Sequence, residues 1–173
     1  MCIKSTTMQL YFAHFSPPAR TVLMTIRNLN LEVELKHIDF LKGDNKTEEF
    51  MKLSPLKQVP VLVEEDGFVL TESRAISAYL VNSRNPGSDL YPKDPLRRAI
   101  IDQRLYYDAT VVFQSHIEIL HPMSAGIRLD EYSNLKQWFE RCKSLTGFEE
   151  NYEGGKLVSG LLKMRGLPPL YNI

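Results

Sequence analysis

The sequence predicts an α/β domain followed by an all-helical domain. Over residues 8–83, apolar runs of strand-forming residues alternate with amphipathic segments, in the order β-α-β-α-β-β-α. A stretch rich in proline and glycine at 85–95 is typical of a linker, and the pattern after it is helical only. We therefore expect a first domain at 1–84, a linker at 85–95 and a helical domain at 96–173.

The composition is that of an ordinary globular protein. The 173 residues are 43% hydrophobic and 24% charged, and 21 basic residues balance 21 acidic ones. No basic field favours nucleic acid, and no apolar run approaches the ~20 residues of a membrane span. The first ten residues lack the apolar region of a signal peptide. With two distant cysteines, Cys2 and Cys142, we expect a cytoplasmic protein with reduced thiols.

The first strand and the first helix are separated by a serine-proline turn. Met8–Ala13 is an apolar run typical of a buried strand. The turn Ser16–Pro18 follows, and proline is favoured at a helix start because its missing N–H would have no partner there. The helix is expected over 19–29. A second strand over 33–40 would lie parallel to the first through a right-handed crossover.

The stretch 57–76 contains the clearest local pattern. Apolar runs at Val59–Val63 and Phe68–Leu70 flank the turn Glu64–Gly67, which predicts a β-hairpin with an Asp-Gly turn. The hairpin leads directly into Glu72, which opens a helical run. A hairpin edge and a helix N-terminus are therefore expected side by side, and such a corner suits a small ligand with carboxylates.

Beyond the linker, three helices are expected. The first is a long amphipathic run over 96–120, which the His-Pro pair at 121–122 ends. The second covers 132–143. The third, over 148–164, is weaker because the glycine pair at 154–155 interrupts it.

Several motifs resemble those of cytosolic glutathione transferases of the insect delta/epsilon or theta-like kind. They are SPPAR at 16–20, SPLKQVPVL at 54–62, GFVLTESRAISAYL at 67–80, LYPKDPLRRAIIDQRL at 90–105 and LKQWFERCK at 135–143. The resemblance implies a thioredoxin-like first domain and an all-helical second domain. It also implies a shortened second domain. In relatives further helices stand between the last two motifs, so about three helices of ~12 residues are missing, with the join near 113–117.

The resemblance implies an enzyme that joins the glutathione thiolate to hydrophobic electrophiles in detoxification, with glutathione as substrate and no metal. Ser16 is the candidate catalytic residue. A free thiol titrates near about 8.5, and a hydroxyl at a helix N-terminus would favour the thiolate. Ser16 is alternatively an ordinary turn serine. A thiol–disulfide oxidoreductase is disfavoured, because Ser16–Ala19 stands in place of a Cys-x-x-Cys pair.

Eight residues are implied to bind glutathione: Asn45, Lys57, Gln58, Val59, Pro60, Glu72, Ser73 and Arg74. A cis Pro60 would turn the Val59 backbone toward the cysteinyl part of the ligand, whereas the alternative is a plain proline at a strand start. Glu72 would accept from the γ-glutamyl ammonium. Ser73 would bind the γ-glutamyl carboxylate, would cap the helix, or would do both.

The remaining contacts concern the glycyl end and the charge of the site. Lys57 and Gln58 stand where relatives meet the glycyl end, and lysine keeps a cation and a donor for its carboxylate. Asn45 stands where relatives often have histidine. Arg74 either adds positive charge near the ligand or is solvated.

The second-substrate pocket is implied to include Tyr107 and Phe113. Because the missing helices would wall this pocket, the alternative to the enzyme is a catalytically impaired protein that binds glutathione or dimerises. A homodimer is implied in either case. The histidines show no ligand spacing and are expected to be structural or solvated. They are His14, His37, His116 and His121.

Overall fold

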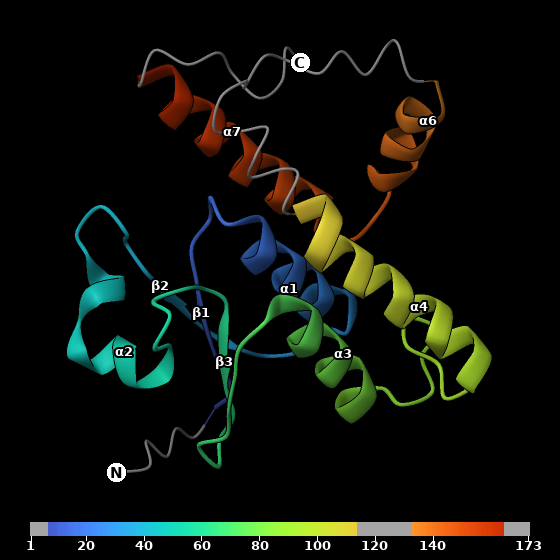
Figure 1. The fold of residues 1–173 in the computed structure, drawn as a ribbon, viewed down its shortest axis with the longest axis horizontal. Coiled ribbons are helices and arrows are strands. Elements are labelled where there is room, and N and C mark those ends of the chain that lie inside the picture. Colours follow the sequence, from blue (N-terminus) through green and yellow to red (C-terminus); the bar gives the residue numbers. More distant parts are fainter. Residues whose placement is uncertain (1–6, 114–132, 165–173) are drawn as a thin grey trace. The chain divides into compact units, whose positions relative to one another are not determined.

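A computed structural model describes residues 7–113 and 133–164 (Figure 1). The chain is divided into two compact units between Leu90 and Tyr91. The first unit contains a mixed sheet with helices, and the described part of the second is helical. The predicted fold classes are thus confirmed, while the predicted boundaries at 84 and 96 stay predictions.

The sheet of the first unit has four strands in the order β2-β1-β3-β4. They are β1 (Gln9–Phe12), β2 (Glu34–His37), β3 (Val61–Val63) and β4 (Val69–Leu70). β1 is parallel to β2, as predicted from the crossover, and antiparallel to β3. β3 and β4 form the predicted hairpin. Its turn closes through Gly67, at φ 89°, whose N–H donates to the Glu64 carbonyl at 2.9 Å.

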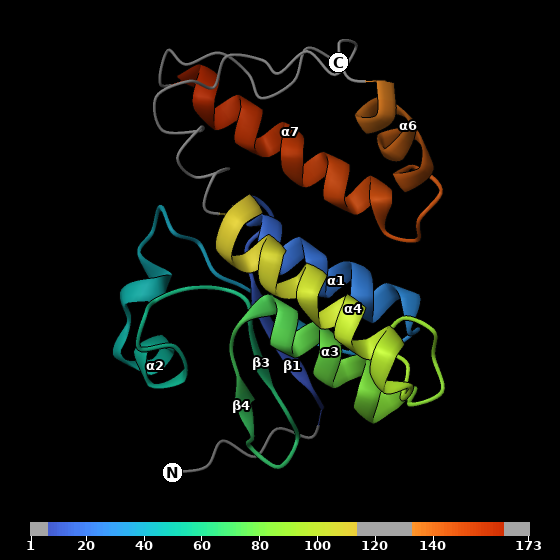
Figure 2. The same ribbon diagram turned by 45° about the vertical axis from the view of Figure 1, so that its right-hand side comes forward.

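The helices of the first unit lie on both faces of this sheet (Figures 1 and 2). They are α1 (Pro17–Asn28), the 3₁₀ turn η1 (Asp44–Lys46), α2 (Glu48–Leu53) and α3 (Ser73–Arg84). Because side chains alternate along a strand, Leu10 and Leu62 lie on the face of the sheet that packs against α1 and α3. The same alternation places Val61 and Val63 in the core that includes Phe50 of α2. Each fully buried Leu or Ile stabilises the fold by about 1.5–3 kcal/mol.

The second unit begins with α4 (Pro95–Tyr107), which a side chain caps. The Asp94 carboxylate accepts from the Arg97 N–H at 2.8 Å. A π-helical turn, η2 (Asp108–Val112), follows, and α6 (Ser133–Cys142) and α7 (Phe148–Met164) come later. The predicted helix end at 121–122 and residues 114–117 of the predicted join lie outside the described residues.

α7 differs from the sequence prediction. It runs without a break through Gly154 and Gly155, so the predicted interruption is wrong. A glycine within a helix costs only about 1 kcal/mol relative to alanine, which the rest of a 17-residue helix can offset. None of the described helices is long and apolar enough to cross a membrane.

Candidate functional site

Three chain segments leave the sheet of the first unit at one edge. Tyr11 of β1 pairs with Val61 of β3, and Leu62 pairs with Leu70 of β4. Because β3 is antiparallel to both neighbours, the residues after β1, before β3 and after β4 lie at the same edge. The turn that contains Ser16, the segment before β3 and the start of α3 are thereby brought together.

Ser16 is the N-cap of α1. Its Oγ accepts from the Ala19 N–H at 3.3 Å, its own N–H donates to the Ala13 carbonyl at 3.0 Å, and it is 8% exposed. Ser16 is therefore the cap of α1, and its catalytic role stays a prediction. A hydroxyl can accept twice and donate once, so the cap leaves its hydrogen for another partner.

Proline makes the N-terminus of α1 poor in backbone donors. Pro17 and Pro18 occupy the first two helical positions and have no N–H, and the N–H of Ala19 is taken by Ser16. An anion at this end would meet the positive end of the helix dipole but few N–H groups. The hydroxyl of Ser16 is the donor best placed to bind it.

The N-terminus of α3 has the opposite character. Glu72 occupies the N-cap position and makes no side-chain cap, so the alternative in which Ser73 is the cap does not hold. The Ser73 side chain is buried, 2% exposed, and its Oγ accepts from Nη1 of Arg74 at 3.0 Å. The first N–H groups of a helix have no intrahelical partner, and no proline removes them here. This end suits a carboxylate.

The backbone conformation also distinguishes this region. Asn30, Lys57 and Glu72 are the non-glycine residues with positive φ in the part of the chain that the structure describes. Glu72 has φ 67° and ψ 106°, outside the usual left-handed well. Such conformations persist only where the surroundings enforce them, and they gather at ligand sites. Two of the three are predicted binding residues.

The segment before β3 is held by a residue that the sequence analysis missed. Ser54, 2% exposed, donates its hydroxyl to the Gln58 carbonyl at 3.0 Å and accepts from the Gln58 N–H at 3.1 Å. The peptide between Val59 and Pro60 is cis, as predicted. Gln58 and Lys57 are exposed, so their side chains are open to solvent. The sequence shows only a serine and a proline at the end of a short helix, which does not reveal these hydrogen bonds.

Asn45 contacts the same segment from η1. Its Nδ2 donates to the carbonyl of Lys57 at 3.3 Å, and the residue is 8% exposed. Its Oδ1 is buried and has no hydrogen-bond partner among the described residues. The side chain therefore supports the loop directly, and any contact of Asn45 with a ligand remains a prediction.

The other predicted site residues lie in the second unit. Tyr107 is the last residue of α4 and is exposed, and Phe113 directly follows η2 and is half-buried. No group of three or more histidine, cysteine, aspartate or glutamate side chains in the described residues could hold a metal ion.

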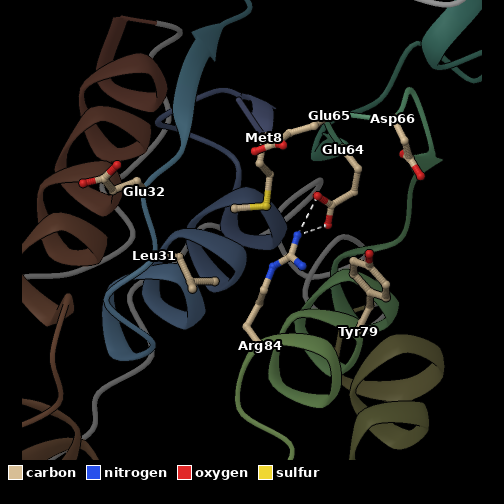
Figure 3. Close-up of a pocket in the computed structure, with 8 residues that line it drawn as sticks. All are labelled: Met8, Leu31, Glu32, Glu64, Glu65, Asp66, Tyr79 and Arg84. Carbon is tan, nitrogen blue, oxygen red and sulfur yellow. Dashed lines mark hydrogen bonds and ion pairs between the residues drawn. The ribbon is translucent and has the colours of Figure 1, made fainter. Parts of the chain in front are cut away.

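A cavity of about 410 Å³ lies elsewhere in the first unit (Figure 3). It is lined by Met8, before β1, by Glu64 after β3, and by Tyr79 and Arg84 of α3, so it marks the opposite sheet edge. Arg84 bridges both carboxylate oxygens of Glu64 at 2.8 and 2.6 Å. Burial, followed by a hydrogen bond to Glu64, raises the pKa of Tyr79. No predicted site residue lines this cavity.

Sequence comparison relates the chain to insect enzymes. Residues 6–82 match the family described as glutathione S-transferase, N-terminal domain. The chain is 37% identical over 140 residues to glutathione S-transferase D7 of Anopheles gambiae and 41% identical over 117 residues to glutathione S-transferase 1 of Manduca sexta. These alignments cover 78% and 67% of this chain but 64% and 54% of the two relatives, so the chain spans less than two thirds of their length.

Solved structures agree with this relationship. An epsilon-class glutathione S-transferase from the housefly Musca domestica has a TM-score of 0.82 at 28% identity, covering 93% of this chain and 99% of that one. The Bombyx mori glutathione transferase BmGSTD1 has a TM-score of 0.65 at 31% identity, covering 85% and 74%. A glutathione transferase homologue from Drosophila mojavensis, solved with bound glutathione, has a TM-score of 0.62 at 26% identity, covering 88% and 78%. The first unit is thus thioredoxin-like.

Proposed function

Because this chain belongs to the glutathione S-transferase family, we propose that it catalyses attack of the glutathione thiolate on hydrophobic electrophiles. The observation that carries this proposal is the contrast between the two helix N-termini at one sheet edge. α1 offers a hydroxyl with few N–H groups, which suits a thiolate, whereas α3 offers N–H groups, which suit a carboxylate.

In this proposal Ser16 donates a hydrogen bond to the glutathione sulfur. The thiol proton leaves to solvent, the thiolate forms a carbon–sulfur bond with the electrophile, and a leaving group such as halide departs with its electron pair. Lowering the thiol pKa by two units requires roughly 2.7 kcal/mol. One charge-assisted hydrogen bond together with a helix N-terminus is sufficient for this.

The rest of glutathione would lie along the same edge. The Val59 backbone, next to the cis Pro60, would pair with the cysteinyl N–H and C=O. Glu72 would accept from the γ-glutamyl ammonium, and Ser73, with the first N–H groups of α3, would bind the γ-glutamyl carboxylate. Arg74 already donates to the Ser73 hydroxyl and would add positive charge there.

The glycyl end would meet two exposed side chains. Lys57 and Gln58 would face the glycyl carboxylate. Asn45 would hold the carbonyl of Lys57 in place, in addition to its own contact with the ligand. Tyr107 and Phe113 would line the second-substrate pocket. We also propose a homodimer and a cytoplasmic location, which the family relationship supports.

Two measurements on the purified chain test the proposed function. Retention on immobilised glutathione with elution by free glutathione tests binding, and turnover of an activated aromatic halide tests catalysis. We expect both. Retention without turnover would leave a glutathione-binding protein that is not an enzyme, and failure to bind would overturn the proposal altogether.

A further inference from the structure

The fold brings together two histidines that the sequence separates by 22 residues. His14 follows β1, and His37 is the last residue of β2, where it is paired in register with Phe12. The centroids of the two imidazole rings are 5.4 Å apart, with their planes inclined by 30°. Both residues are exposed. We propose that His14 and His37 form a two-imidazole site for a borderline divalent transition-metal ion, of which Ni²⁺ serves as the probe.

The separation of the rings fits a common metal ion. A metal–nitrogen bond of about 2.1 Å places a metal ~3.2 Å from an imidazole centroid. Two centroids 5.4 Å apart then subtend about 115° at the metal, which is close to a tetrahedral angle. The terminal torsion of histidine is broad, so exposed rings can turn a nitrogen toward a shared point at little cost. Imidazole is a preferred ligand of nickel, copper and zinc.

Phe12 keeps the two rings close to each other. Its ring contacts His14 edge-on at 4.8 Å between centroids and His37 edge-on at 5.6 Å. Phe12 is itself only 4% exposed and belongs to the main core of the first unit. Phe12 therefore keeps the two imidazoles near each other, so only the rotation of each ring about its terminal torsion has to be ordered when a metal binds.

The surroundings limit the strength of this site. No third histidine, cysteine or carboxylate joins the pair in the described residues, so water would complete the coordination. Arg20 donates from Nη1 to the His14 carbonyl at 2.9 Å, which puts a positive charge close to the pair. We therefore expect weak, reversible binding that chelators remove, rather than a structural metal.

The test is calorimetric titration with Ni²⁺ at pH about 8, where free imidazole is neutral. Cys2 and Cys142 are both replaced by serine in every protein, so that thiols do not contribute. Because the second imidazole is held at a high effective concentration, we expect one ion per chain and a loss of at least about tenfold in affinity in either His14→Ala or His37→Ala. His116→Ala is the matched control and should bind as the parent does.

Independent binding by separate histidines predicts a different result. Each single substitution would then lower the number of bound ions and leave the affinity of the rest unchanged, and His116→Ala would do the same. That result, or no binding by the parent, would overturn the proposal. Circular dichroism of each variant checks folding. Since no glutathione is used, failure here leaves the proposed transferase activity untouched.

Discussion

Ser16 combines a cap and a proposed chemical role, and substitution can separate the two. Ser16→Gly destabilises the folded protein by only a few tenths of a kcal/mol through the lost helix cap, whereas Ser16→Ala destabilises it by about 1 kcal/mol. Glycine removes the hydroxyl, so the pKa of bound glutathione should rise toward that of the free thiol. Activity near pH 7 should fall by up to ~25-fold and recover as the pH is raised, because a rise of two units from about 6.5 to about 8.5 lowers the thiolate fraction by that factor. The pH profile of kcat/KM for the electrophile, at saturating glutathione, measures this pKa.

A second hydroxyl on the same helix provides the control. Thr21 is exposed and donates its Oγ1 to the Pro17 carbonyl at 3.2 Å, within α1. Thr21→Ala should leave the pH profile as it is. A Ser16→Gly protein whose profile matched the parent would show that the hydroxyl does not set the state of the thiol.

Asn45 gives the second prediction at this scale. Asn45→Ala removes the hydrogen bond to the Lys57 carbonyl, and we expect a destabilisation of about 1 kcal/mol. KM for glutathione should rise while kcat changes little, because only the loop that meets the ligand is loosened. The control is Asn28→Ala, whose exposed amide donates to the Met24 carbonyl at 2.8 Å. An equal fall in kcat and kcat/KM would contradict a positioning role.

Among the secondary-structure elements, the central strands and the hairpin turn are those that the local sequence pattern predicts best. The runs that became β1 and β3 alternate between two cores, and the Asp-Gly turn required the positive φ that Gly67 adopts. α7 was harder, because the cost of its glycine pair is local, whereas the residues that offset it are spread over the 17-residue helix.

Features that depend on register between distant segments could not be predicted. The motifs suggested Ser16 and the α3 start as site residues, but the positive φ of Glu72 depends on how β4 meets α3. The contact between His14 and His37 arises from the parallel pairing of β1 with β2, which a search for ligand spacing along the chain does not detect. The Ser54 hydrogen bonds are equally invisible to periodicity.

The ion pair between the hairpin turn and α3 yields the prediction at the element scale. The Glu64 side chain is 9% exposed and that of Arg84 is 38% exposed. Arg84→Ala leaves a buried carboxylate without this partner, and we expect a loss of about 1–3 kcal/mol, below the figure for fully buried pairs because water reaches Arg84. Chemical denaturation measures the loss.

Two further variants isolate the charge of Glu64 from the packing of Arg84. Glu64→Gln in the Arg84→Ala background should restore part of the stability, because a neutral amide is easier to bury than a carboxylate. Lys42→Ala, which breaks the exposed pair with Asp39, should change stability by less than about 0.5 kcal/mol. A double variant as unstable as the sum of the single ones would show that the pair does not act as a unit.

For the whole molecule, the proposed functions are divided between the two units. Every predicted glutathione contact lies in the first unit, whereas Tyr107 and Phe113 lie in the second. The chain also spans 64% and 54% of the length of the two curated relatives, and the join implied by the sequence motifs lies near residues 113–117. Glutathione binding and electrophile turnover should therefore be affected by substitutions in different units of the chain.

Thermal unfolding in the presence of glutathione measures glutathione binding without electrophile turnover. A ligand that binds only the folded chain adds about 2.7 kcal/mol of stability at a concentration 100 times its Kd. We expect Tm to rise steadily with glutathione in the parent and in Ser16→Gly, because the serine acts on the thiolate more than on the tripeptide as a whole. Glu72→Ala should abolish most of the rise. A parent Tm that is insensitive to glutathione would contradict the proposed site in the first unit, whatever the state of the second.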